Sequence, residues 1–206
     1  NGARFADFDT HTGQLTAQDD VMLLAPVALG IATPAQIAAL RPAIAALDPA
    51  TITWPMGAWM ATAAAEVAGL PEVACALAAA ICERAYDFWD ARAALPGRTL
   101  PGISCEYWPP DGRCGGEGYG WGAFTTHLVL HTLLGLAPAS DGLHLRPNLP
   151  VAWRVPGREY RVALHWRSQP IAITLTAYGA QARVTVNQRS ALVPWGDALV
   201  YGWGTL

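Results

Sequence analysis

Two carboxylates set among aromatic residues make residues 101–122 the stretch best suited to chemistry. The segment reads PGISCEYWPPDGRCGGEGYGWG and contains the acids Glu106 and Glu117. Its Gly and Pro content predicts a loop that presents side chains, not a helix or a strand. Its aromatic residues are Tyr107, Trp108, Tyr119 and Trp121. Sugar rings stack on aromatic faces, and their hydroxyls and glycosidic oxygens need carboxylate partners, so this combination indicates a carbohydrate site.

Composition restricts the classes of protein to consider. With 206 residues, of which 52% are hydrophobic and 14% charged, the chain can bury a core as one large or two small domains. A net charge of −3 provides no basic patch, so nucleic acid is not expected as a partner. No apolar run reaches about 18 residues and the first residues carry no export signal, so no membrane span is expected. The location stays open, with the cytoplasm slightly favoured.

The first 136 residues predict helices in hairpin-like succession. An apolar run at 21–29 ends at Gly30, and Thr33 then provides an N-cap for a helix over 34–47. Pro42 should kink that helix or split it into two shorter turns. Further helices are predicted over 56–67, 71–89 and 122–134, the second of these being apolar on nearly every side.

Beyond residue 136 the pattern changes to that of an antiparallel sheet. Residues 137–157 contain three prolines in LAPASDGLHLRPNLP and are interpreted as a linker. Strands with a period of two are predicted over 158–166, 171–177, 181–187 and 198–203. A tight turn at Tyr178-Gly179-Ala180 should join two of them. We therefore predict a helical domain over 1–136 and a β domain over 158–206, whose completeness the sequence leaves open.

Three blocks of the helical part resemble a known family. FADFDTHTG with the following LLAPVALGIATPAQIAAL, then WPMGAW, then EYWPPDG with GYGWGAF, occur in the order seen in six-hairpin (α/α)6-barrel glycosidases. They are most similar to the processing α-glucosidase and mannosylglycerate hydrolase group. The WPMGAW block departs from the family pattern, because Pro55 stands where that group has Arg and the Gly is at position 57. This departure concerns a loop that contacts substrate in the family.

The resemblance implies a fold and an activity. The fold would be mainly α with appended β: the C-terminal part of an (α/α)6 toroid followed by an antiparallel β-sheet or sandwich region. The activity would be inverting hydrolysis of an α-glycosidic bond, with two carboxylates about 6.5–9.5 Å apart. Glu106 matches the family's general base, with Glu117 as the alternative. The family's general acid is an Asp upstream, so the upstream half of the barrel is an expected partner, and this fragment alone is expected to be inactive. The alternative is a carbohydrate-binding or catalytically degenerate member.

Further residues are candidates for holding a sugar. Asp7 and Asp9 could bind hydroxyls, form turns or act as an acid. Aromatic candidates for stacking on a sugar are Trp54, Trp59, Tyr107, Trp108, Tyr119 and Trp121, each of which could equally belong to the core.

No cofactor or metal is expected. Cys75 and Cys82 share a helix face and are interpreted as core residues. Cys105 and Cys114 flank the PPDG turn, where they could be free thiols, a small disulfide or metal ligands. His127 and His131 are spaced for zinc, but no third ligand follows at a matching offset. A zinc-holding α/α toroid of the lanthionine cyclase type is the remaining alternative.

Overall fold

The computed structural model describes residues 5–16, 20–93, 104–107, 117–119, 122–166 and 168–205. Contacts divide the chain into two compact units, residues 1–128 and 129–206. The elements of the first unit are β1 (Phe8–Asp9), β2 (Gln14–Leu15), η1 (Val21–Leu24), α1 (Ala25–Ala28), α2 (Pro34–Ala45), η2 (Pro49–Thr51), α3 (Pro55–Val67), α4 (Pro71–Ala93), β3 (Ser104–Cys105), β4 (Glu117–Tyr119) and α5 (Ala123–His127). A π-helical segment, η4 (Leu128–Leu133), continues α5.

Local sequence signals set the starts of these helices. Thr33 forms a capping box with Gln36, in which the Thr33 hydroxyl accepts the Gln36 N–H and Gln36 Oε1 accepts the Thr33 N–H. Pro55 and Pro71 occupy the first positions of α3 and α4, where a missing N–H costs nothing. The predicted helices over 34–47, 56–67 and 71–89 are confirmed, with small shifts at their ends. The predicted split at Pro42 is wrong, because α2 runs through it as one helix.

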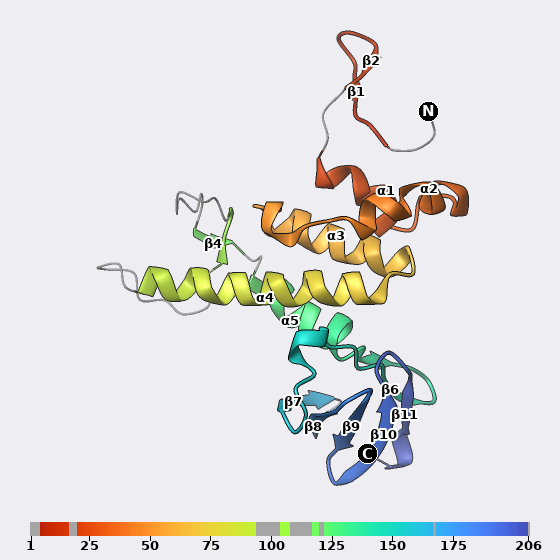
Figure 1. Cartoon of the computed structure of the whole chain (residues 1–206), viewed down its shortest axis with the longest axis vertical. Helices are drawn as coiled ribbons and strands as arrows, with labels where there is room; N and C mark the ends of the chain where they lie inside the picture. The colour runs from red at the N-terminus through yellow and green to blue at the C-terminus, as the bar shows by residue number, and fades with distance from the viewer. Residues whose placement is uncertain are drawn as a thin grey trace. The chain divides into compact units, whose positions relative to one another are not determined.

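Helix α3 is the centre of the first unit. It packs against α4, α2, α1 and η1, and it lies between α2 and α4 in Figure 1. Its buried residues are mostly small: Gly57, Ala58, Ala61, Ala64 and Ala65. Small side chains let neighbouring backbones approach closely, so α3 can be shared by several partners at once.

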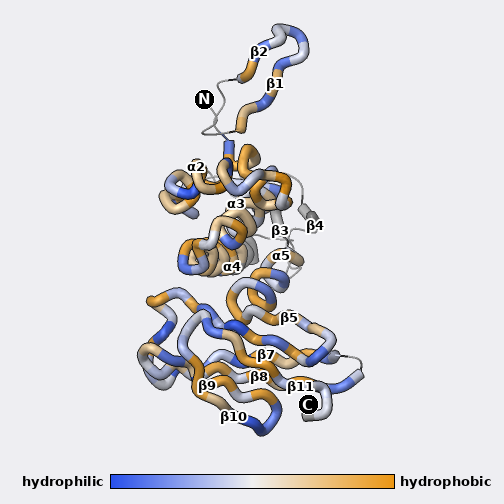
Figure 2. Tube along the Cα trace, turned by 90° about the vertical axis from the view of Figure 1, so that its right-hand side faces the viewer, coloured by the Kyte–Doolittle hydropathy of each residue, from blue (hydrophilic) through white to orange (hydrophobic). Residues whose placement is uncertain are grey.

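The predicted toroid is wrong. In the part of the chain that the structure describes, the helices do not close into a ring. Instead α2, α3, α4 and α5 follow one another in a stack, seen from two sides in Figures 1 and 2. The physical reason is that η1, α1 and α2 all pack against α3. These elements therefore do not extend outward to form the next hairpin of a ring.

The second unit contains two antiparallel sheets. The four-stranded sheet has the order β10-β9-β8-β7, built from β7 (Glu159–Trp166), β8 (Gln169–Tyr178), β9 (Gln181–Val186) and β10 (Arg189–Pro194). The three-stranded sheet has the order β11-β6-β5, built from β5 (Ala137–Pro138), β6 (Gly142–Leu145) and β11 (Leu199–Gly202). The segment interpreted as a linker therefore supplies two strands, β5 and β6, and the short 3-10 helix η5 (Val151–Trp153).

Alternating burial in the strands builds the core of the second unit. In β8 the side chains of Ile171, Ile173 and Leu175 are buried while their neighbours are more exposed. The predicted turn at Tyr178-Gly179-Ala180 is confirmed, since Tyr178 pairs with Gln181 and Gly179 has φ +61°. From the other sheet, the Tyr201 hydroxyl donates to the Val184 carbonyl at 3.3 Å, and burial raises the pKa of Tyr201.

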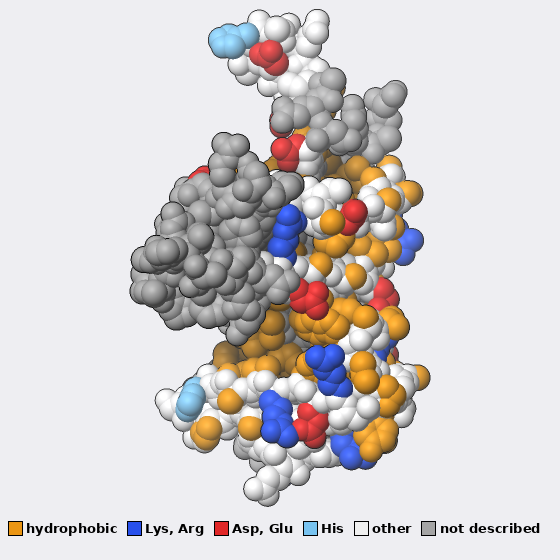
Figure 3. All heavy atoms as spheres, turned by 60° about the vertical axis from the view of Figure 1, so that its left-hand side comes forward, with side chains coloured by type: hydrophobic (Ala, Val, Ile, Leu, Met, Phe, Trp, Pro, Cys, Tyr) orange, Lys and Arg blue, Asp and Glu red, His pale blue; other side chains and the backbone are white. Residues whose placement is uncertain are grey.

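Neither unit provides a helix for crossing a bilayer. Among the described residues, no helix is both long and apolar enough to do so. On the face seen in Figure 3, basic side chains are scattered among acidic, apolar and neutral groups. The exclusion of nucleic acid as a partner stays a prediction.

The close approach at Gly57 generates a stability prediction. A Cβ added there would lie 2.6 Å from Val21 Cγ1, so in Gly57→Ala the Val21 side chain, or η1 and α3 with it, must shift. We expect a loss of about 1–3 kcal/mol in the free energy of unfolding, measured by urea denaturation. Gly204→Ala is the control, because a Cβ at Gly204 meets nothing within 4 Å. Equal stability of both variants would contradict the tight contact.

Candidate functional site

A pocket of about 840 Å3 lies within the first unit. Its walls come from the start of the chain, η1, α2, the segment between η2 and α3, and the residue after Glu106. The lining residues are Phe5, Asp20, Val21, Leu23, Leu24, Leu40, Ala43, Leu47, Thr51, Ile52, Thr53, Trp54 and Tyr107. Its volume falls within the range of about 300–1,000 Å3 typical of small-molecule sites.

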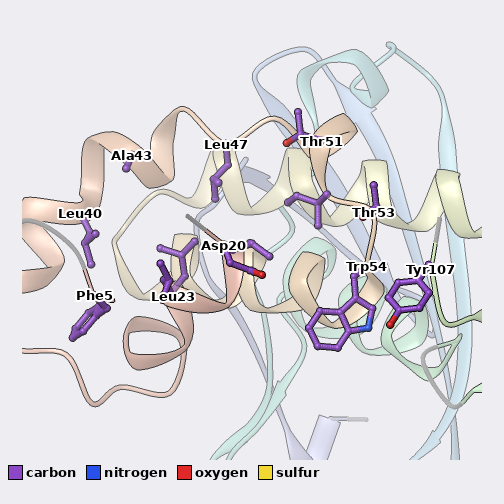
Figure 4. A pocket seen from close by; sticks show the side chains of 13 residues that line it. Phe5, Asp20, Leu23, Leu40, Ala43, Leu47, Thr51, Thr53, Trp54 and Tyr107 are labelled. Carbon is purple, nitrogen blue, oxygen red and sulfur yellow. The ribbon is translucent and has the colours of Figure 1, made fainter. Parts of the chain in front are cut away.

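The two ends of the pocket differ in chemistry. In Figure 4, Trp54 and Tyr107 lie together at one end, while Phe5 and Leu40 lie at the other, with Leu23 between them. The aromatic end therefore offers ring faces with an indole N–H and a phenol hydroxyl. The opposite end, which we call the α2 arm, is hydrocarbon, with Phe5, Leu40, Ala43 and Leu47 as its walls.

The helical period of α2 explains the α2 arm. Leu40 and Ala43, three residues apart, share one face of α2, and Leu47, four residues further on, follows its C-terminus on that side. Leu40 is buried and Leu47 half-buried, whereas Ala43 is exposed. This face is thus only partly covered by protein, and the remaining apolar surface belongs to the pocket.

Arg84 of α4 holds the segment that carries Trp54. Its Nη1 donates to the Ile52 carbonyl at 2.8 Å and to the Pro49 carbonyl at 3.4 Å. Burial lowers the pKa of this guanidinium from its ordinary value. On the other side of η2, Asp48 Oδ1 accepts the Ala50 N–H at 2.9 Å. Both contacts hold the backbone that leads into the aromatic end.

Asp20 is the carboxylate among the lining residues, and it has a structural role. Its Oδ1 accepts the Met22 N–H at 2.8 Å and so caps η1. The cap turns the chain into the apolar segment from Val21 to Leu24, three residues of which line the pocket.

The structure brings together some of the predicted site residues. Trp54 and Tyr107, far apart in the sequence, line the same pocket. Glu106 directly precedes Tyr107 and is half-buried, while the Tyr107 side chain is 44% exposed. Phe5, Leu23, Leu24 and Leu40 of the first block line it as well, so the pocket joins all three blocks that carry the family resemblance.

Other candidates lie elsewhere in the first unit. Trp59 is not among the lining residues, and its ring stacks on Phe124 of α5 with centroids 5.7 Å apart. Asp9 Oδ1 accepts the N–H groups of His11 at 2.8 Å and Thr12 at 3.3 Å in the β1–β2 turn. These bonds lower the pKa of Asp9, with the His11 bond as the largest cause. Asp7 is exposed in the same hairpin.

Several candidates cannot be placed. Trp108, Trp121 and Cys114 lie outside the described residues. Glu117 and Tyr119 belong to β4 and Cys105 to β3, but their side chains are outside the described part of the structure.

The described residues contain no cluster of three or more His, Cys, Asp or Glu that could hold a metal ion. The His127 ring contacts Trp59, with centroids 6.3 Å apart. Cys82 Sγ donates to the Thr125 carbonyl at 3.8 Å, and burial, followed by the charge of Glu83, raises the pKa of its thiol to about 11. This thiol is held protonated at neutral pH. Cys75 is buried, whereas Cys82 is half-buried.

Some lining residues were not singled out from the sequence. The α2 arm could have been found from the spacing of residues 40, 43 and 47, since an apolar stripe needs a partner. Asp20 carried the signal of an N-cap before an apolar run. Phe5 carried no such signal, because it belongs to no regular element.

Comparisons with protein-family models, with curated proteins and with solved structures find no match.

The Asp9 turn gives a pH prediction. Its pKa is lowered from 3.8 in the folded hairpin, so the carboxylate stabilises the turn above that ordinary value, and the stabilisation is lost as pH falls through the lowered pKa. We expect contacts between Phe8 and Leu15, which pair in the hairpin, to weaken in NMR spectra below about pH 3.8. In Asp9→Asn, whose amide oxygen can accept the same bonds, they should not depend on pH. Weakening in both proteins would refute this role.

The Arg84 contact predicts a local effect on the pocket. Arg84→Met removes a charged donor to the Ile52 carbonyl, worth about 1.5–3 kcal/mol. Hydrogen exchange should therefore speed up in residues 51–54. Arg41→Met is the matched control, because Arg41 Nε donates to the Ala68 carbonyl at the other end of α3. If exchange in 51–54 responds equally to both variants, Arg84 does not hold this segment.

Proposed function

We propose that the pocket binds the sugar of an α-glycoside, and that the chain is part of an inverting glycosidase with Glu106 as general base. The observation that carries the proposal is the meeting of Trp54 and Tyr107 in one pocket, directly beside Glu106 in the sequence. Two aromatic side chains at one end of a concave site suit the C–H faces of a pyranose.

In this proposal Glu106 removes a proton from the water that attacks the anomeric carbon. The general acid, which protonates the leaving oxygen, must then be a residue outside the lining of this pocket. Asp20 is a poor substitute, because its Oδ1 accepts the Met22 N–H and the carboxylate is used to cap η1.

A second candidate is a carbohydrate-binding protein without turnover. The role of Asp20 favours it, because the carboxylate that lines the pocket is used as a helix cap. Such a protein would need the aromatic end of the pocket but not Glu106.

Binding can be tested by titrating the chain with methyl α-D-glucopyranoside and methyl α-D-mannopyranoside, followed by NMR. Tyr107→Ala should weaken binding about tenfold or more, because loss of the ring removes roughly 1.5–3 kcal/mol of apolar contact. Tyr107→Phe keeps the ring and should retain most of the affinity. Trp195→Phe, in the second unit, should change nothing. Failure of both sugars to bind, or binding unaffected by Tyr107→Ala, would overturn the proposal.

Turnover separates the two candidates. In the full-length protein, Glu106→Gln should lower the rate of α-glycoside hydrolysis by about 10²-fold or more while sugar binding persists. If the unchanged full-length protein binds sugar but hydrolyses no α-glycoside, the binding protein is the correct alternative.

A further inference from the structure

We propose that the ligand is an amphiphilic glycoside, with its sugar between Trp54 and Tyr107 and a hydrocarbon aglycone along the α2 arm. This inference rests on the proposed function, because it uses the sugar to fill the aromatic end. It adds the chemical class of the group on the other side of the glycosidic bond.

The first argument is the polarity of the pocket along its length. Figure 4 shows the side chains with hydrogen-bonding atoms, namely Thr51, Thr53, Trp54 and Tyr107, toward one side, with Asp20 near the middle. The α2 arm, on the other side, is bounded by Phe5, Leu40, Ala43 and Leu47. A ligand that fills both parts must itself change from polar to apolar.

The second argument is size. A pyranose of twelve heavy atoms occupies on the order of 200 Å3 at the packing density of organic solids. The pocket measures about 840 Å3. One sugar at the aromatic end therefore leaves the α2 arm unfilled, and the aglycone must occupy it or leave it to water.

The third argument excludes a second sugar from the α2 arm. The hydroxyls of a sugar lose their hydrogen bonds to water on entering, and the side chains of the α2 arm offer none in return. An alkyl chain has no such groups to satisfy, and it removes its own apolar surface and that of Leu40 and Leu47 from water. The chemistry of the walls therefore selects hydrocarbon over oligosaccharide.

The test compares methyl and octyl α-D-glucopyranoside, and the corresponding mannosides, by calorimetry below the concentration at which octyl glycosides form micelles. The octyl glycoside should bind at least about a hundredfold more tightly, since each buried methylene contributes roughly fourfold. 1-Octanol, which has the chain without the sugar, should bind more weakly than the octyl glycoside.

A pair of α2 variants locates the chain. Ala43→Phe places a ring in the α2 arm and should remove the preference, so that this variant binds the octyl and the methyl glycoside with equal affinity. Ala38→Phe makes the same change at another exposed position of α2 that does not line the pocket, about 140° around the helix. It should retain the preference for the octyl glycoside.

The outcomes separate the two proposals. Equal affinity for methyl and octyl glycosides, or an octyl preference that survives Ala43→Phe, overturns this inference and leaves the proposed function standing. Octanol that binds as tightly as the octyl glycoside shows that the sugar contributes nothing, which overturns the proposed function and with it the glycoside. Binding of none of these probes overturns both.

Discussion

The packing of helix α3 is the constraint on which the first unit depends. Because Gly57, Ala58 and Ala61 present almost no side chain, η1, α1 and α2 can approach on one side while α4 packs on another. The contact at Gly57 is tight, since a Cβ at this position would require Val21 to shift. The same approach brings η1 and α2 to opposite walls of one pocket, with the segment leading into α3 as its end. The site is therefore a consequence of how the helices share α3.

Larger side chains determine where the packing around α3 leaves space. Leu40 lies in α2, Leu47 follows the end of that helix, and Trp54 precedes the first turn of α3. All three side chains line the pocket, so the elements do not close on one another there. The polarity of each wall follows from the element that supplies it. The face of α2 supplies hydrocarbon, and the segment between η2 and α3 supplies threonine hydroxyls and an aromatic ring. This separation, produced by packing, is what makes the pocket suited to a ligand with two chemically different ends.

The second unit is held by different means. Period-two alternation in β8 and β9 buries Ile173, Leu175 and Val184, and Tyr201 links the second sheet to the first through one hydrogen bond. Two glycines allow close backbone contacts that a Cβ would prevent: Gly142 against the Tyr201 carbonyl, and Gly135 against the Arg146 carbonyl. None of these residues lines the pocket.

Local signals in the sequence by themselves determined the longer helices and four strands, namely β7, β8, β9 and β11. The Thr33 cap, the prolines that begin α3 and α4, and Gly179 in its turn act over a few residues, so they can be interpreted without the fold. Strand β10 was missed because Asn187, at φ +53°, begins its turn without the usual glycine. Only the tertiary structure decided that the helices share α3 and do not form a ring. It also decided that Trp54 lines the same pocket as Tyr107, whereas Trp59 stacks on Phe124. Those outcomes depend on contacts between residues distant in sequence. The type of an apolar or aromatic residue predicts that it will be covered, but not which distant residue will cover it.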